Sequence, residues 1–381
     1  MRSGQFDMLL VQAKTAHTAA MIEHAGDELP KQISTVPVAC VDIGGTKVAV
    51  SLVDANGVHE RLTEPTCKSG SNDALARQVI RLIGQSCKLA GLDAGDLAAV
   101  GVSSCGPFVM RNGLIELASP NICGGLVIAA GNAGRTTQTG PTIQAAQTGH
   151  AGRLPNDWTS ALLEQPLRAV FKTIRIENDA IAALQAERRW GELRGNGQPL
   201  DDCAYVTWST GVGVGLCVNG HVLRGKNGNA GHAGHQFVID NTSALCGCGN
   251  IGDVEALIGG QGMGQRFAAD GYASPTVLFQ AAQSGDDAAL YIVDELCRVM
   301  GRMLYNLVVT LDLQRISLGG SVFWNHREFL LPRLSEQLVG KLPALTDGFE
   351  LVSAGLGQQV GDYGALALAL TLTQKNQASV S

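Results

Sequence analysis

The sequence lacks several features that would assign its class at once. No apolar run approaches the roughly 18 residues needed to cross a bilayer, so no membrane partner is expected. There is no basic block, and the net charge of −6 makes nucleic acid a poor partner on electrostatic grounds. The start of the chain has no apolar centre like that of a signal peptide. The G-x-x-x-x-G-K-[ST] pattern of the usual P-loop is absent as well.

The cysteines do not form a disulfide framework. Eight of the ten are scattered singly, and most of these lie in apolar segments, as Cys40 and Cys203 do, which is typical of reduced core residues. Cys246 and Cys248 form the only tight pair. Without a secretion signal, this usage favours a cytoplasmic protein.

The sequence contains the same glycine-containing hairpin pattern twice. The stretch VPVACVDIGGTKVAVSLVDANGVHERLTE predicts a strand, a glycine turn, a strand, an Asn-Gly turn and a strand. CAYVTWSTGVGVGLCVNGHVLRG, at 203–225, has the same pattern. Such a repeat predicts two similar lobes, as in an enzyme with pseudo-symmetric halves. Unrelated hairpins that mimic a duplication remain the alternative.

The remaining segments suggest a division of the 381 residues. Residues 1–36 form an N-terminal extension, helical or disordered, and residues 37–157 form a small lobe in β-β-β-α-β order. A stretch rich in Gly, Thr, Gln and Ala, at about 124–157, is expected to be an inserted loop. Residues 158–381 form the large lobe, whose closing helix is expected to be able to pack back on the small lobe.

The glycine turns indicate phosphate binding. A phosphate needs backbone N–H donors that can approach it closely, and a hydroxyl group helps, so Gly with Ser or Thr is favoured. Asp42 would act through Mg²⁺ or its water shell rather than on phosphate directly. Either hairpin turn alone is better explained as an ordinary turn, whereas the two together, with Gly319-Gly320 at the end of a predicted buried strand, favour phosphate binding. The segments that fit the phosphate pattern are Gly44-Gly45-Thr46, Thr210-Gly211-Val212-Gly213 and Gly319-Gly320.

Asn178-Asp179 falls where a predicted strand becomes a helix. Asn and Asp are favoured helix N-caps, so the pair has a purely structural interpretation. An Asp at the carboxyl end of a strand is also placed to take the proton from a hydroxyl that attacks a phosphoryl group. The sequence leaves both interpretations open.

A loop-rich stretch gathers metal-binding side chains. His235, Cys246 and Cys248 provide an imidazole and two thiolates, which suit a tetrahedral Zn²⁺ site, and Asp253 is the nearest candidate for a fourth ligand. The alternative is a pair of free thiols in a glycine loop.

Six segments together resemble the ROK family of sugar kinases, in the sugar kinase/actin-like ATPase superfamily, from about residue 37 to about residue 372. Any one segment alone is unspecific, whereas six in the right order are specific. The resemblance implies an α/β, two-lobed actin-like ATPase (ribonuclease H-like) fold with duplicated βββαβ domains around a cleft. The segments are VDIGGTKVAV, GVSSCGPF followed by GLIELASPN, ENDAIAALQAE, STGVGVGLCVNGHVLRGKNGNAGHAGHQFV, CGCGNIGDVEAL and TLDLQRISLGGSV.

The resemblance also implies an ATP-dependent kinase that acts on a hexose, an amino sugar or a sugar-like cyclitol. Asp179 would deprotonate the 6-hydroxyl, and the expected assembly is a homodimer or homotetramer. A structural zinc ion would be held by His235, Cys246 and Cys248, with Asp253. The residues implied in sugar binding are Asn121, Asn178, His232, His235 and Glu255. Those implied in binding ATP and Mg²⁺ are Asp42, Gly44, Gly45, Thr46, Lys47, Thr210, Gly211, Gly213, Gly319 and Gly320.

Four departures from the family pattern qualify this expectation. His232 stands where the family has a sugar-contacting Glu, which predicts an altered substrate, and Asp253 replaces the third zinc cysteine. Ile181 replaces the usual Asn two residues after the catalytic Asp, and roughly 35 inserted residues follow Asn121. The alternative function is a sugar-responsive ROK-type regulator or a sensor without turnover. A regulator would need an N-terminal DNA-binding segment of about 60 residues or more, whereas some 36 non-basic residues precede the first strand.

Overall fold

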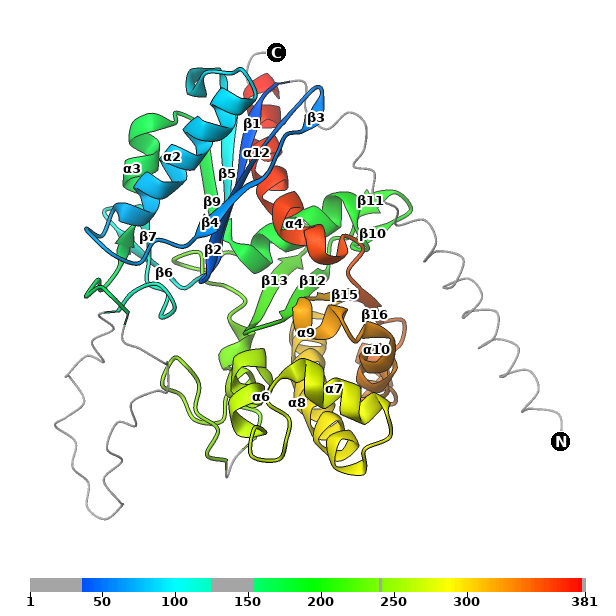
Figure 1. Ribbon diagram of the computed structural model, residues 1–381. Helices are drawn as coiled ribbons and strands as arrows, with labels where there is room; N and C mark the ends of the chain where they lie inside the picture. The colour runs from blue at the N-terminus through cyan, green and yellow to red at the C-terminus, as the bar shows by residue number, and fades with distance from the viewer. Residues whose placement is uncertain (1–35, 125–153, 240–241, 379–381) are drawn as a thin grey trace.

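The computed structural model describes residues 36–124, 154–239 and 242–378. The predicted N-terminal extension and most of the predicted insertion therefore lie outside the described residues. The described chain forms two lobes, one above the other in Figure 1. The elements of the first lobe are β1 (Val38–Ile43), β2 (Lys47–Asp54), β3 (Gly57–Val58), β4 (Leu62–Pro65), α2 (Ala74–Leu89), η1 (Ala94–Asp96), β5 (Ala99–Ser104), β6 (Phe108–Arg111), β7 (Leu114–Leu117), β8 (Ala161–Leu162), α3 (Glu164–Val170) and β9 (Ile174–Asn178).

Helix α4 (Asp179–Trp190) leads from the first lobe into the second. The elements that follow are β10 (Arg194–Gly195), β11 (Gln198–Pro199), β12 (Cys203–Trp208), β13 (Val212–Val218), β14 (His221–Val222), η3 (Ala233–His235), α5 (Val254–Ile258), α6 (Gly260–Arg266), α7 (Pro275–Gln283), α8 (Asp287–Leu311), β15 (Arg315–Gly319), α9 (Ser321–Trp324), α10 (Arg327–Glu336), α11 (Pro343–Thr346), β16 (Glu350–Ser353), η4 (Gly357–Gln359) and α12 (Val360–Ala378).

The two main sheets share a five-strand topology, and the first sheet has one additional strand, β4, which pairs with β2. Their strand orders are β3-β2-β1-β5-β9 and β14-β13-β12-β15-β16. In each, the first three strands in chain order form an antiparallel meander, and the last two join in parallel. The predicted duplication and fold class are thus confirmed.

Alternation along β1 sets the direction of Asp42. Successive side chains of a strand point to opposite faces of the sheet. Ala39 and Val41 pack in the core under α2 and α3, whereas Val38 and Cys40 pack in the core under α12. Asp42 continues the second series, so its carboxylate lies on the face that α12 covers.

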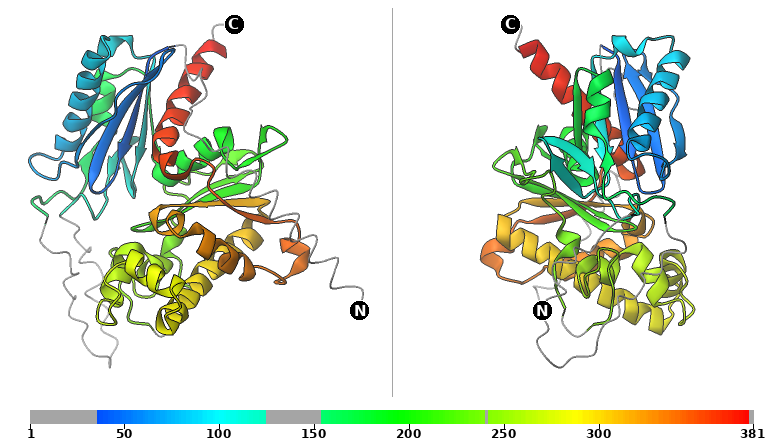
Figure 2. Two further views of the ribbon diagram at one scale, coloured as in Figure 1. Left: turned by 45° about the vertical axis from the view of Figure 1, so that its right-hand side comes forward. Right: turned by 90° about the vertical axis from the view of Figure 1, so that its left-hand side faces the viewer.

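Helices α4 and α12 pack against each other and form the layer between the two sheets (Figure 2). Helix α12 covers β1 and β5 of the first sheet, while α4 covers β12 and β13 of the second. The segment 365–370 of α12 is buried throughout, as expected of a helix that is apolar all round. Helix α4 follows β9, the last strand of the first sheet, and α12 follows β16, the last strand of the second sheet, so both helices begin where the lobes meet.

The first lobe extends further along the chain than the sequence predicted. Residues 158–178 were assigned to the large lobe, but β9 pairs in parallel with β5 of the first sheet. Trp158 and Leu167 are buried in the core of the first lobe. The lobe therefore ends at Asn178, directly before α4. None of the helices in the described part of the chain has the length and apolar character needed to span a bilayer.

Candidate active site where the lobes meet

The structure assigns the helix-capping role to Asn178. The Asn178 side chain caps α4 by accepting a hydrogen bond from the Ala180 N–H, at 3.1 Å. Asp179 is the first residue of the helix, and its side chain is exposed. One Asp179 oxygen shares the same donor, at 2.8 Å. Because Asn178 supplies the cap, the exposed Asp179 is available for chemistry.

Asp179 lies within electrostatic reach of Asp42 in the first lobe. Although the Asp179 side chain reaches solvent, the surrounding protein displaces much of the nearby water and raises the pKa of Asp179 to about 6, and the Asp42 carboxylate adds to this rise. Loss of solvent and Asp362 likewise raise the pKa of Asp42 to about 6, opposed by Arg61 and Lys47. Both carboxyl groups are therefore mostly ionised at pH 7. A base with a pKa close to the working pH is well suited to accept a proton.

These pKa values predict a pH dependence of activity. Protonation removes the base, so kcat/KM should be constant above pH 7 and fall about tenfold per pH unit below pH 6. Because the two carboxyl groups interact, the apparent pKa belongs to the pair. This apparent pKa is obtained from kcat/KM measured between pH 5 and pH 8 at subsaturating ATP. A flat profile over this range would contradict the assignment of Asp179 as base.

The first glycine turn, residues 44–46, joins β1 to β2 beside Asp42. It is closed by a hydrogen bond from the Gly44 N–H to the Lys47 carbonyl, at 2.9 Å. Thr66, directly after β4, anchors the turn, because its hydroxyl donates to the Gly44 carbonyl at 2.7 Å. Asn121 lies against the turn: a methyl group at Gly45 would be 3.0 Å from the Asn121 Cβ. The structure thus gathers the expected phosphate turn and one expected sugar contact at one edge of the first lobe.

The second glycine turn, residues 209–211, joins β12 to β13. Glu255 holds it, since its carboxylate accepts the Val212 N–H at 2.9 Å. Gly211 packs directly against this carboxylate: a methyl group there would lie 2.4 Å from the Glu255 Oε2 atom and would displace it. Gly213 packs beside Ala180, which places the start of β13 next to the Asp179 end of α4. Glu255, expected as a sugar contact, thus also braces the second turn.

Gly319 and Gly320 lie beside the second turn in the same sheet. Gly319 ends β15 and pairs in register with Thr207 of β12. Gly320 is the N-cap residue before α9, with a φ of 89°, and lies close to the Thr207 hydroxyl. Thr207 was not singled out in the sequence, although it lies just before the second turn.

His232 lies between the lobes in a defined orientation. Its Nδ1 atom lies 3.0 Å from the Asn229 carbonyl oxygen, which can only accept, so Nδ1 carries the proton. Burial lowers the pKa of His232, so the ring is neutral and its Nε2 atom is an acceptor at pH 7. That atom and Asn178 approach Gly106 of the first lobe: a methyl group there would lie 3.0 Å from the His232 Nε2 and 3.2 Å from the Asn178 Nδ2. His232 thus presents an acceptor, as the family Glu would, but without charge.

Asn229 is a site residue that the sequence did not reveal. Its side-chain amide pairs with both backbone groups of Phe108, at 2.8 and 2.7 Å. It thereby joins the His232 loop to the first lobe. The only local signal was an Asn in a glycine-rich loop, which is common in turns.

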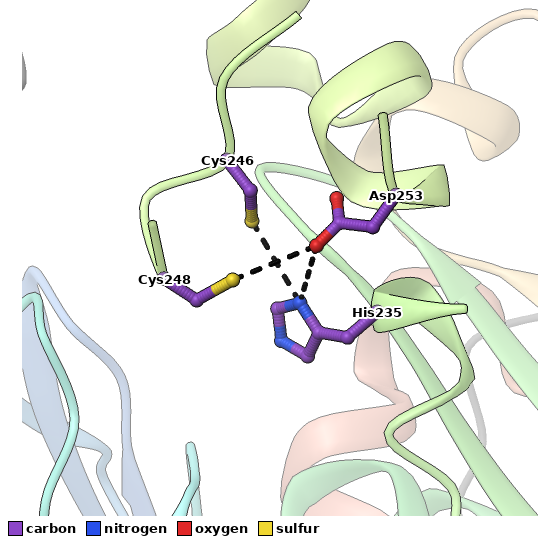
Figure 3. Close-up of side chains that lie close together, drawn as sticks. All are labelled: His235, Cys246, Cys248 and Asp253. Carbon is purple, nitrogen blue, oxygen red and sulfur yellow. Dashed lines mark hydrogen bonds and ion pairs between the residues drawn. The ribbon is translucent and has the colours of Figure 1, made fainter. Parts of the chain in front are cut away.

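The four predicted metal ligands converge (Figure 3). One ligand atom from each of His235, Cys246, Cys248 and Asp253 lies within 4.8 Å of the others. Individual separations are 3.0 Å from the His235 Nδ1 to the Asp253 Oδ2, 3.7 Å from that Nδ1 to the Cys246 Sγ, and 3.5 Å from the Cys248 Sγ to the Asp253 Oδ2. Ligands around a tetrahedral zinc ion are about 3.3–3.8 Å apart, so the set fits zinc. Asp253 is fully buried, and its second oxygen caps α5 through the Ala256 N–H.

Known proteins resemble this chain in sequence and in fold. The sequence model of the ROK family matches residues 142–372. A glucokinase of Aeropyrum pernix is 30% identical over 352 residues, covering 87% of this chain and 96% of the relative. An N-acetylmannosamine kinase of Salmonella paratyphi B is 31% identical over 284 residues, covering 74% and 82%. The crystal structure of a ROK hexokinase from Thermus thermophilus superimposes with a TM-score of 0.65 at 27% identity, covering 89% and 99%. The chain therefore belongs to the ROK family.

Proposed function

We propose that this protein is an ATP-dependent sugar kinase that transfers the γ-phosphoryl group of ATP to a hydroxyl group of its substrate. The acceptor is the 6-hydroxyl of a hexose, an amino sugar or a sugar-like cyclitol. The observation that carries the proposal is the exposed Asp179 carboxylate where the lobes meet, beside Asp42 and the two glycine turns. The relatives named glucokinase and N-acetylmannosamine kinase support it.

Each part of the site has a role in phosphoryl transfer. Asp179 accepts the proton of the attacking hydroxyl, and the backbone N–H groups of the glycine turns hold the phosphates. Asp42, whose side chain is 24% exposed beside the first turn, offers the carboxylate oxygen that Mg²⁺ prefers. Bound Mg²⁺ neutralises charge on the transferring phosphates. Asn121, Asn178 and His232 orient the sugar.

We further propose that the cluster of His235, Cys246, Cys248 and Asp253 holds a structural zinc ion. Burial raises the pKa of both thiols, so they stay protonated unless a cation displaces the protons. The His235 Nδ1 atom faces the cluster, which leaves its ring stacked beside His232, with ring centroids 6.2 Å apart. The ion would fix this loop rather than take part in the chemistry. The expected homodimer or homotetramer and the cytoplasmic location stay predictions.

A coupled ADP-release assay tests the proposed function. The screen covers glucose, mannose, fructose, N-acetylated and free amino sugars, and cyclitols, each with Mg-ATP. At least one should give turnover above the rate of ATP hydrolysis without acceptor. Failure of the whole panel would contradict the kinase assignment and favour a sensor without turnover.

Replacing His232 with Glu should change substrate preference. The substitution exchanges a neutral acceptor for a charged one at a half-buried site, and it removes the hydrogen bond to Asn229. Relative kcat/KM should shift about tenfold or more toward glucose or N-acetylmannosamine, because sites that bond a hydroxyl pattern discriminate strongly. The KM for ATP should stay within about twofold. An unchanged ranking of sugars would show that His232 does not contact the substrate.

A further inference from the structure

Arg61 lies between two carboxylates that belong to different parts of the chain. Its Nε atom is 2.9 Å from Asp362 Oδ1, and its Nη2 atom is 3.8 Å from Asp42 Oδ2. Asp362 belongs to the first turn of α12, which follows the last strand of the second lobe. The contact therefore links the strand meander of the first lobe to a segment 301 residues away.

The fold brings the two acids together on one face of the first sheet. Asp42 points to the α12 face of β1, and α12 approaches it through Gly361. A methyl group at Gly361 would lie 3.4 Å from the Asp42 Oδ2. Leu62 of β4 packs toward α2, so Arg61, one residue earlier, turns to the α12 face. Its guanidinium is the group that meets both acids.

A contribution to folding stability does not account for the Arg61 contacts. The side chains of Arg61 and Asp362 are 35% and 40% exposed, and ion pairs of this kind contribute little to folding. Arg61 also borders a cavity of about 180 Å³ lined by Val53, Val58 and Leu366, so it does not fill the core. Without Arg61, however, two like charges would face each other beside the first glycine turn.

We propose that Arg61 is a positioning residue for Asp42: it shields the Asp42 carboxylate from Asp362 and so holds it in place on the α12 face of β1, at the end of the strand that leads into the first glycine turn. The inference rests on the proposed use of Mg-ATP, because Asp42 is the residue that would meet the metal. Without Arg61, repulsion by Asp362 displaces the Asp42 carboxylate from this position. The defect that follows loss of Arg61 is therefore a defect in metal-dependent nucleotide binding, and it depends on Asp362.

A charge-removal series tests this dependence through equilibrium binding. The variants are Arg61→Gln, Asp362→Asn and the double variant Arg61→Gln/Asp362→Asn. Arg81→Gln is the matched control, since Arg81 pairs with Glu64 on the exposed side of the same lobe. The dissociation constant of AMPPNP is measured by calorimetry with and without Mg²⁺, after thermal melting has shown that each variant is folded.

We expect Arg61→Gln to weaken Mg-AMPPNP binding by about tenfold and to leave metal-free AMPPNP unchanged. The double variant should recover to within about threefold of the wild type, and the Asp362→Asn and Arg81→Gln variants should stay within about twofold. A double variant as weak as Arg61→Gln, or an Arg61→Gln variant that binds like the wild type, would overturn the inference. Because binding is the readout, failure of the sugar screen with intact Mg-AMPPNP binding would count against the proposed function and not against Arg61.

Discussion

Replacing Asp179 with Asn should lower kcat by about a thousandfold, within the range expected for loss of a general base. The amide keeps the size of the side chain but cannot accept the proton of the attacking hydroxyl. Helix α4 should remain intact, because its cap is the Asn178 side chain. Sugar binding, measured by calorimetry or intrinsic fluorescence, should therefore stay within about twofold of the wild type.

The matched control for this variant is Asp287→Asn. Asp287 is likewise the first residue of a helix, with Asp286 as its cap, but it belongs to α8 of the second lobe. The Asp287→Asn substitution should leave kcat unchanged. An Asp179→Asn enzyme with a normal rate would remove the proposed base. It would also favour the sensor interpretation, in which a sugar binds without turnover and Asp179 has no chemical role.

Replacing Cys246 with Ser should release the metal and disrupt sugar binding. The hydroxyl is a much poorer zinc ligand than a thiolate, and the cluster would be left with three ligands. Cys246 is buried and contacts both His235 and Glu255, at 3.7 Å each. Loss of the ion would therefore free the loop that carries His235 and loosen the support of the second glycine turn.

We expect about one zinc ion per wild-type chain by elemental analysis and less than a tenth of that in Cys246→Ser. The melting temperature should fall by several degrees, and the KM for the sugar should rise about tenfold or more. Cys67→Ser is the control, because this partly exposed cysteine of the first lobe lies outside the cluster. A wild-type protein purified without zinc, and unaffected by chelation, would contradict the structural zinc site.

Local signals in the sequence sufficed to predict much of the fold. The second Asn-Gly turn has φ values of 50° and 75° at Asn219 and Gly220, as a two-residue hairpin requires. Because a turn of this kind depends on only a few adjacent residues, both meanders and the duplication were predictable. The cluster of His235, Cys246, Cys248 and Asp253 was also predictable, since residue type and spacing indicate it.

Features that depend on distant contacts were not predictable from local patterns. Nothing in residues 158–178 indicates which sheet will accept β9, so the lobe boundary was placed about 20 residues too early. Asn229 joins a loop of the second lobe to Phe108, and Arg61 meets Asp362 on the last helix. An asparagine in a glycine-rich loop and an arginine before an edge strand look ordinary in a sequence. Their roles arise only when the two lobes are brought together.

The central claim is that Asp179 faces the acceptor hydroxyl at the end of a nucleotide held by two glycine turns. A crystal structure of the Asp179→Asn variant with its sugar, Mg²⁺ and AMPPNP tests this claim most directly. We predict the residue 179 side chain within about 3.2 Å of the acceptor oxygen, with that oxygen in line with the terminal phosphorus. A side chain turned away from the sugar, or a triphosphate that contacts only one of the two turns, would contradict the account.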